Sequence, residues 1–392
     1  MDPFAGVDFD GRAFRVYSSV DESDATNADK FIHGSDELTG EAVNDAVFNR
    51  NQTVSDLLNI AFEFTDANWS YSNADAQLKR LIEAGTDEWD VMANDLRTLA
   101  NLSRDGYIHN VAHSDILDLS RSYWYGDAMK DVQFVEGGMY LLIGDYFTDA
   151  LQSAHCLYQN RNILNNVYGS ENYITDMVFD GKWTYDAMIR VIEDTAQDLN
   201  GDGEMTQGDD LFGFTCWAKW GSTVPFLIGT GIKFVERTED GPRFCFNNER
   251  SVKILEKMNE LYYSPAAHSD LTNPSMQTLQ GLFTNGMTTL MGYNRLGSMA
   301  DFREVEFGMG PLPYPKLDEE QADYVSSLHD TTEVGAIPMT VPQENLAFCQ
   351  TVLEVACRET GRTVIPEWYE NGLLGTERIS RFQYRGKYEV TG

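Results

Sequence analysis

The apolar and polar positions in the N-terminal part of the chain alternate between a strand period and a helix period. Helices and strands therefore follow one another in the order β-α-β-α-β, which predicts an α/β fold with a mostly parallel sheet and helices on both faces. Short apolar runs predict strands at 14–18, 59–64 and 89–93. Amphipathic stripes predict helices at 41–58 and 73–84.

The middle of the chain is richer in helix-period patterns, and strand patterns return near its C-terminal part. The expected elements are helices at 184–197, 250–263 and 275–284, strands at 287–291, 305–309 and 334–337, and a last helix from 344 to 360 that Gly361 ends. Because the strands resume after an interruption, we expect two lobes with a ligand cleft between them.

We expect the chain to cross from one lobe to the other three times, near 150–157, 286–293 and 334–338. The first lobe would then contain 1–152 plus 292–334, and the second 153–291 plus 335–392. Several crossings restrict the relative motion of two lobes to a hinge bend.

Composition excludes several classes of protein. Of the 392 residues, 42% are hydrophobic and 12% aromatic, which suffices for a sizeable core and excludes a disordered chain. The formal net charge of −33 repels nucleic acid and anionic membrane faces, and favours neutral or cationic ligands. The five cysteines form no CxxC pair, and an odd number argues against a full disulfide framework, so most are expected to be buried thiols.

The run from Asp198 to Asp209 has the spacing of an EF-hand-type calcium loop, with Gly203 at the sixth position, where the chain must turn sharply. The alternative is an acidic, glycine-rich turn in solvent. Because a single loop sits in a large chain, a structural role that ties the helix before it to the strand after it is expected. The predicted calcium ligands are Asp198, Asn200, Asp202, Glu204 through its carbonyl, and Asp209.

Several segments, in order along the chain, resemble a group of extracellular solute-binding proteins of bacterial ABC importers. The strongest match is Gly181-Lys-Trp-Thr184 followed by Asp198–Gly203. The other segments that carry the resemblance are Gly40–Asn51, Ser122–Asp127, Gly144-Asp145, Gln159–Gly169, Leu312–Lys316 and Gly335–Thr340. The chain lacks the lipobox cysteine of this family, and the segment Arg381–Lys387 departs from the family pattern.

The resemblance implies a two-lobe, periplasmic-binding-protein-like α/β fold that captures an oligosaccharide or related polar solute by hinge closure and passes it to ABC permease subunits. It also implies an extracellular protein, held at the cell surface by a lipid anchor that this sequence does not contain. We expect a monomer without catalytic activity, with Ca²⁺ as a structural cofactor and no nucleic-acid partner.

Ligand contacts in this family come from loops at strand ends that face the cleft. Sugar rings stack on aromatic faces, and their hydroxyl groups need paired donors and acceptors. The candidate ligand residues are Trp69, Tyr71, Asn94, Asp95, Asp149, Trp217, Trp220, Tyr293, Asn294 and Arg295. A single tryptophan is more often a core residue or a half-buried surface anchor than a stacking platform, and an arginine in so acidic a chain can simply pair with a carboxylate.

Two other functions stay open on the sequence alone. A secreted glycoside hydrolase or lyase needs a pair of carboxylates, which a chain with 62 acidic residues could hide anywhere. A cohesin-binding scaffold module is suggested by the calcium loop alone, although such modules have duplicated loops in a short chain. No nucleophile elbow, Ser-x-x-Lys or HExxH motif is present.

Overall fold

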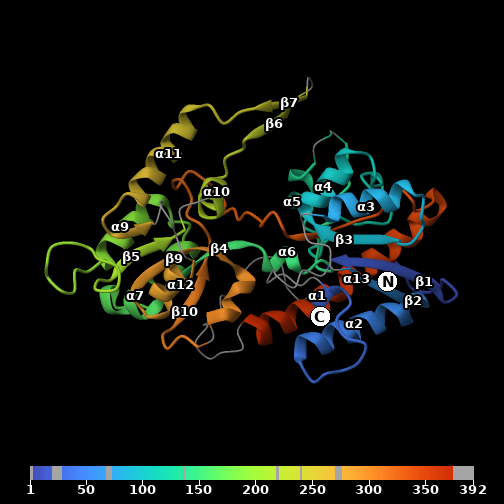
Figure 1. The fold of residues 1–392 in the computed structure, drawn as a ribbon, viewed down its shortest axis with the longest axis horizontal. Helices are drawn as coiled ribbons and strands as arrows, with labels where there is room; N and C mark the ends of the chain where they lie inside the picture. Colours follow the sequence, from blue (N-terminus) through green and yellow to red (C-terminus); the bar gives the residue numbers. More distant parts are fainter. Residues whose placement is uncertain are drawn as a thin grey trace. The chain divides into compact units, whose positions relative to one another are not determined.

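The computed structural model describes residues 3–19, 29–67, 73–133, 135, 137–217, 220–238, 241–269, 276–302 and 304–373. The chain divides into two compact units, each with its own sheet and hydrophobic core (Figure 1). The first unit contains residues 3–153 and 330–373, and the second contains 154–329. The α/β class predicted from the sequence is confirmed.

The first unit is built on a four-stranded sheet with the strand order β11-β3-β1-β2. The strands β1, β2 and β3 are parallel, and β11 runs antiparallel to β3. The elements of the first unit are β1 (Arg12–Ser19), α1 (Asp29–Ile32), α2 (Ala42–Leu58), β2 (Ile60–Ala67), α3 (Ala74–Glu83), β3 (Val91–Asp95), α4 (Leu96–Arg104), α5 (Gly126–Asp131), α6 (Asp149–Gln152), β11 (Glu333–Ala336), η2 (Gln343–Asn345), α13 (Leu346–Glu367) and the π-helical turn η3 (Trp368–Leu373).

Helices cover both faces of this sheet, with α2 and α13 on one side and α3 and α4 on the other (Figure 1). In the first of these layers the ring of Phe14 of β1 lies 5.7 Å from that of Phe62 of β2 and 5.8 Å from that of Phe348 of α13. Asn59 adopts a left-handed conformation at φ 51°, which ends α2 and lets the chain turn directly into β2.

The second unit has a five-stranded mixed sheet with the order β10-β4-β9-β5-β8 and a separate hairpin of β6 and β7. Strands β5, β8 and β9 are parallel, whereas β4 runs antiparallel to its neighbours β9 and β10. The elements of the second unit are β4 (His155–Asn160), α7 (Arg161–Tyr168), α8 (Tyr173–Phe179), α9 (Tyr185–Thr195), β5 (Phe212–Cys216), α10 (Trp220–Gly229), β6 (Val235–Thr238), β7 (Gly241–Phe244), α11 (Glu249–Tyr262), β8 (Ala267–Ser269), α12 (Met276–Thr284), β9 (Thr288–Arg295), η1 (Leu296–Phe302) and β10 (Met309–Leu312).

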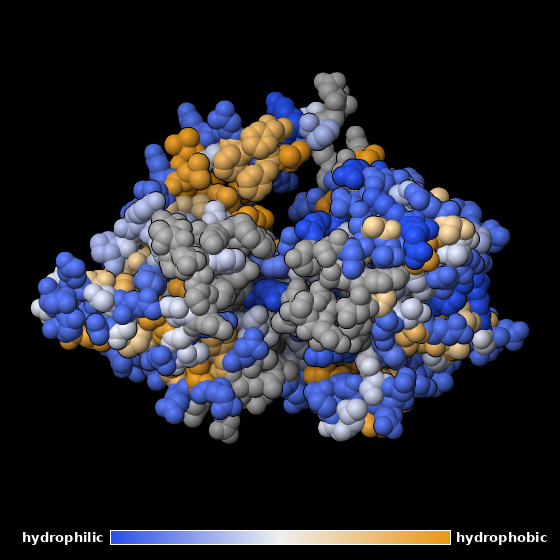
Figure 2. All heavy atoms as spheres, viewed as in Figure 1, coloured by the Kyte–Doolittle hydropathy of each residue, from blue (hydrophilic) through white to orange (hydrophobic). Residues whose placement is uncertain are grey.

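The surface of the second unit is not uniformly polar. Apolar side chains gather over α11 and beside the hairpin (Figure 2). Val235 and Phe244, which are cross-strand partners in the hairpin, are 50% and 68% exposed, and Val252 and Leu255 of α11 are also exposed. Among the described helices of both units, none combines the length and the apolarity that a membrane crossing requires.

Of the three predicted places where the chain crosses between the lobes, the second and the third were wrong. Within the described residues the chain passes from the first unit to the second after Ser153 and returns after His329. Residues 292–329 stay in the second unit, because β9 continues to Arg295 beside β4, and β10 also pairs with β4. Residues 335–373 belong to the first unit, because β11 pairs with β3 and α13 packs on α2.

The predicted end of the last helix at Gly361 was also wrong, since α13 continues to Glu367. This glycine permits a close approach rather than a helix stop. A Cβ atom at position 361 would lie 2.5 Å from a carboxylate oxygen of Asp145, so with any other residue here the Asp145 carboxylate would have to shift.

Candidate functional site

In each unit, the carboxyl ends of the parallel strands form the edge where α/β proteins bind ligands. The candidate residues Asn94 and Asp95 end β3 in the first unit, and Arg295 ends β9 in the second. Trp217 directly follows β5, whose neighbour in the sheet is β9. These four residues therefore lie at or directly after strand ends, and their role in ligand binding stays a prediction.

The first edge is acidic and buried. Asn94 donates a hydrogen bond from Nδ2 to the hydroxyl of Tyr17 at 2.9 Å. Asp95 caps α4, with Oδ1 accepting from the backbone N–H of Thr98 at 2.9 Å and Oδ2 from the Thr98 hydroxyl at 2.6 Å. Burial raises the pKa of Asp95 above its ordinary value, and the bonds from Thr98 oppose this shift.

Asp149 joins the same edge through β11. Its Oδ2 accepts from the backbone N–H of Glu333 at 2.8 Å and from the hydroxyl of Ser153 at 3.2 Å. Glu333 in turn stands opposite Asp95 in the β3–β11 register. Sequence reasoning missed Glu333, although its place beside the predicted strand 334–337 was a signal that could have found it. The structure thus brings Asp95, Asp149 and Glu333 to one acidic edge.

The second edge carries cationic and aromatic groups. Trp217 is half-buried, and Arg295 stands opposite His155 in the β4–β9 register. His155 is buried, and its Nδ1 contacts the Ser327 hydroxyl at 3.0 Å. Burial, together with His329 and Arg295, lowers the pKa of His155 to about 4, so this imidazole is neutral at pH 7. His155 was not among the candidate residues expected from the sequence, because its place beside Arg295 is set by the long-range pairing of β4 with β9.

The structure does not describe the side chains of the remaining candidate residues. Trp69 and Tyr71 lie outside the described residues. Trp220 begins α10, and Tyr293 and Asn294 lie in β9, but the side chains of all three lie outside the described part of the structure. Their roles in ligand binding stay predictions.

Side chains of the predicted calcium loop accept hydrogen bonds from the backbone N–H groups of the same loop. The two carboxylate oxygens of Asp198 accept from the N–H groups of Gly201 at 2.6 Å and Gly203 at 2.8 Å. In the same way Asn200 Oδ1 accepts from the N–H of Asp202, and Asp202 Oδ1 from that of Glu204, each at 2.8 Å. The first three predicted ligand residues are therefore turned toward the inside of the loop.

The C-terminal end of the loop differs from the predicted calcium site. Asp210 rather than Asp209 is buried there, and it accepts from the N–H groups of Leu199 at 2.8 Å and Thr206 at 2.7 Å. Asp209 is exposed. In the described residues, no group of three or more His, Cys, Asp or Glu side chains is placed to hold a metal ion. The arrangement fits the first part of a calcium shell, and the metal stays a prediction.

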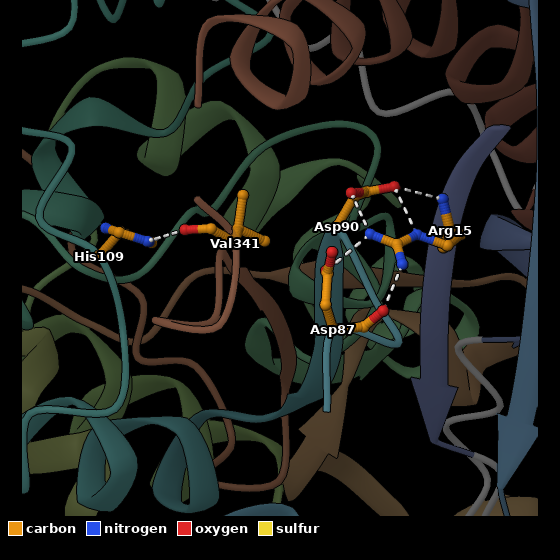
Figure 3. Close-up of polar contacts among 5 residues, drawn as sticks. All are labelled: Arg15, Asp87, Asp90, His109 and Val341. Carbon is orange, nitrogen blue, oxygen red and sulfur yellow. Dashed lines mark hydrogen bonds and ion pairs between the residues drawn. The ribbon is translucent and has the colours of Figure 1, made fainter. Parts of the chain in front are cut away.

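Two other polar networks hold the first unit together rather than forming a site (Figure 3). The guanidinium of Arg15 forms ion pairs with Asp87 and Asp90, each at 2.8 Å. His109 contacts the backbone carbonyl of Val341 through Nε2 at 2.8 Å, which ties together two loops far apart in sequence. Trp124 likewise donates to Glu354 of α13 at 2.7 Å and has a packing role.

The chain is similar in fold to solute-binding proteins of known structure. A family 1 extracellular solute-binding protein from Bifidobacterium longum subsp. infantis matches 91% of this chain and 80% of its own, with 12% identity and a TM-score of 0.58. A cyclo/maltodextrin-binding protein in complex with maltotetraose matches 93% and 84%, with 12% identity and a TM-score of 0.58. UspC of M. tuberculosis matches 88% and 78%, with 14% identity and a TM-score of 0.56.

At these identities the likeness shows the fold. No protein-family model and no curated protein sequence matches the chain. The two-lobe solute-binding fold expected from the sequence motifs is thus confirmed by structural likeness alone.

Proposed function

We propose that this protein is the solute-capturing subunit of an ABC importer and that it binds an oligosaccharide. The observation that carries the proposal is the fold. In the described residues, two chain crossings join two compact α/β units, and nearly the whole chain matches a family 1 solute-binding protein and a cyclo/maltodextrin-binding protein in fold. The candidate ligand residues at the strand ends of both units support it.

In the proposed mechanism the sugar touches both edges. The carboxylates of Asp95, Asp149 and Glu333 accept hydrogen bonds from hydroxyl groups, and Trp217 offers an aromatic face for stacking. A ligand that contacts both units binds the closed arrangement better than the open one, and so shifts the population toward it. No bond is broken. The closed protein then docks on the permease, and a lipid anchor keeps it, as a monomer, at the outer cell surface.

Calorimetric titration with a panel of oligosaccharides that includes maltotetraose tests the proposal, with chromatography of the recovered sugar after each titration. Saturable binding with intact sugar is expected. Recovery of shorter sugars would favour a glycoside hydrolase or lyase instead, because a capture protein returns its ligand unchanged. If no oligosaccharide in the panel bound, the proposed ligand class would be wrong.

Replacing Trp217 by alanine is expected to weaken binding of the sugar found in this way by about 1–3 kcal/mol, because a stacking face and its apolar burial are lost. Stability without ligand should change less than in Trp183→Ala. Trp183 is fully buried and donates to the carbonyl of Pro313 at 3.0 Å, so its loss should cost about 3–5 kcal/mol. If Trp217→Ala bound normally but unfolded as easily as Trp183→Ala, Trp217 would be a core residue.

We also propose that the loop 198–209 binds Ca²⁺ and stabilises the second unit. A ligand that binds only the folded state adds about 2.7 kcal/mol at a hundredfold excess over its Kd. Chelation with EDTA should therefore lower the Tm, and Asp202→Ala should abolish the difference. Asp180→Ala, which removes an exposed carboxylate outside the loop, should leave the EDTA effect intact. Identical melting curves with and without EDTA would count against the metal.

A further inference from the structure

Two carboxylates stand opposite each other at the carboxyl end of β3. Asp95 of β3 and Glu333 of β11 are partners in the antiparallel register of these strands. The side chains of such partners point to the same face of the sheet, with their Cβ atoms about 4.5–5.5 Å apart. Like charges in this position repel each other and destabilise the pairing of the strands. The arrangement therefore costs free energy when both groups are ionised.

Burial strengthens this repulsion, because charges interact more strongly away from water. Asp95 is 7% exposed and Glu333 is 3% exposed. Asp149 adds a third buried carboxylate, and its Oδ2 accepts from the backbone N–H of Glu333 at 2.8 Å. We call these three residues the acidic edge of the first unit. Its negative charge is concentrated where little water reaches it.

The basic side chain that acts on Asp95 lies at the surface. Burial raises the pKa of Asp95 above its ordinary value, and the charge of Asp330 adds to this shift. Arg97 opposes the shift, but Arg97 is exposed. Arg50, which is fully buried in the same unit, donates to backbone carbonyls, an amide oxygen and a hydroxyl rather than to a carboxylate. The acidic edge therefore keeps a negative charge.

Two buried hydroxyl groups at the same edge have no hydrogen-bond partner in the part of the chain that the structure describes. Ser18 of β1 pairs with Ala93 in the register of β1 and β3, so its side chain points to the same face as Asp95, two residues further on. The Oγ of Ser18 is buried and unsatisfied, and so is the Oγ1 of Thr332, which precedes Glu333. Buried polar groups without a partner cost free energy, so these hydroxyls point to a ligand that would bind them.

A ligand with a positive charge on a hydroxylated ring satisfies both features. An ammonium group donates up to three hydrogen bonds, and its charge offsets the repulsion between two carboxylates that flank it. Hydroxyl groups beside it can bind Ser18 and Thr332. A neutral sugar supplies the hydroxyl groups alone and leaves the repulsion of Asp95 and Glu333 in place. The charge of the edge therefore favours an amino sugar over a neutral one.

We propose that the acidic edge selects an oligosaccharide with a free amino group, whose ammonium lies between Asp95 and Glu333 and whose neighbouring hydroxyl binds Ser18. This inference rests on the proposed capture of oligosaccharides and narrows the class of ligand. The competing explanation is that Asp95 and Glu333 share a proton, which would relieve their repulsion without a ligand. A shared proton predicts no preference for amino sugars.

Pairs of sugars that differ in one chemical group test this selectivity. Cellotriose and the glucosamine trisaccharide of the same linkage differ only by a hydroxyl or an ammonium group on the second carbon of each ring. Glucose with glucosamine, and galactose with galactosamine, complete the set. Calorimetry in roughly 1 M NaCl, where the Debye length is about 3 Å, screens the long-range attraction of any cation to a chain with a net charge of −33.

At least one amino sugar should bind at least tenfold more tightly than its neutral counterpart. Equal affinities within every pair, or no binding of any amino sugar, would overturn the inference. The proposed function is judged separately by the oligosaccharide panel. If a neutral sugar of that panel bound and no matched pair showed a preference, the amino-sugar inference would be wrong and capture of oligosaccharides would stand. Failure of every sugar to bind would contradict both.

Glu333→Gln keeps the size of the side chain and removes one of the two opposed charges. It should lower the ratio between the amino-sugar and the neutral-sugar affinity of a matched pair at least fivefold. Asp127→Asn makes the same change in the first unit at a carboxylate that is 95% exposed, and should leave this ratio unchanged. The same ratio in the wild type and in Glu333→Gln would contradict selection by the opposed carboxylates.

Discussion

Arg50→Met is expected to lower the free energy of unfolding by about 3–5 kcal/mol, because it leaves several buried oxygens without a donor. Arg50 is fully buried and donates to the carbonyls of Phe31 and Ile32 at 2.6 and 2.9 Å and to the hydroxyl of Thr360 at 2.6 Å. It also lies over the ring of Tyr146 at 4.6 Å. This one side chain therefore joins α1, α2 and α13.

Burial itself opposes this stabilisation, since it lowers the pKa of Arg50 to about 10. Methionine removes that desolvation penalty, but the orphaned acceptors cost about 1–3 kcal/mol each and outweigh it. Arg362→Met is the matched control. Arg362 is 69% exposed, and its ion-pair partner Glu359 also pairs with Arg358 at 2.9 Å, so the loss of Arg362 should be within about 0.5 kcal/mol. Denaturant unfolding of both variants measures the contrast, and equal stabilities would show that the buried network contributes little.

Gly213→Ala is expected to destabilise the second unit by about 3 kcal/mol or more, at the upper end of overpacking costs. Gly213 lies in β5, and a Cβ atom there would overlap the backbone carbonyl of Ile192 in α9. Because the obstacle is main chain rather than a flexible side chain, α9 would have to move away from the sheet. Urea unfolding measures the loss.

Gly281→Ala makes the same chemical change where nothing lies within 4 Å of the new methyl group. Since Gly281 is inside α12, this control should be neutral or stabilising by up to about 1 kcal/mol. Similar losses at both glycines would mean that the close approach of α9 to β5 has no energetic consequence.

Local pattern was enough to predict most of the expected helices and strands in both units. Helix α9 is an example, since a helix was expected at 184–197 and α9 begins directly after Thr184, whose side chain accepts from the N–H of Ala187. The local sequence pattern gave wrong predictions where contacts between residues far apart in the sequence determine the structure. Gly361 looks like a helix stop, but it lies inside α13, where the carboxylate of Asp145, far away in sequence, closely approaches it. The chain crossings failed for the same reason, because the pairing of β9 and β10 with β4 is not visible locally.

The sequence could indicate those candidate residues that lie at the ends of predicted strands. Asn94, Asp95, Trp217 and Arg295 follow from the rule that ligands bind at the carboxyl ends of parallel strands. Glu333 and His155 did not follow, because both lie on antiparallel strands whose partners are set by long-range pairing. In the calcium loop the spacing pointed to Asp209, whereas the fold buries its neighbour Asp210.

Small-angle scattering with and without a saturating oligosaccharide, using a sugar identified by the calorimetric panel, is the most direct test of the account. If the protein captures sugar by closing its two units, the radius of gyration should fall on saturation, and the sugar should be recovered intact. An unchanged radius of gyration together with release of shorter sugars would contradict capture by closure and identify a rigid carbohydrate-active enzyme.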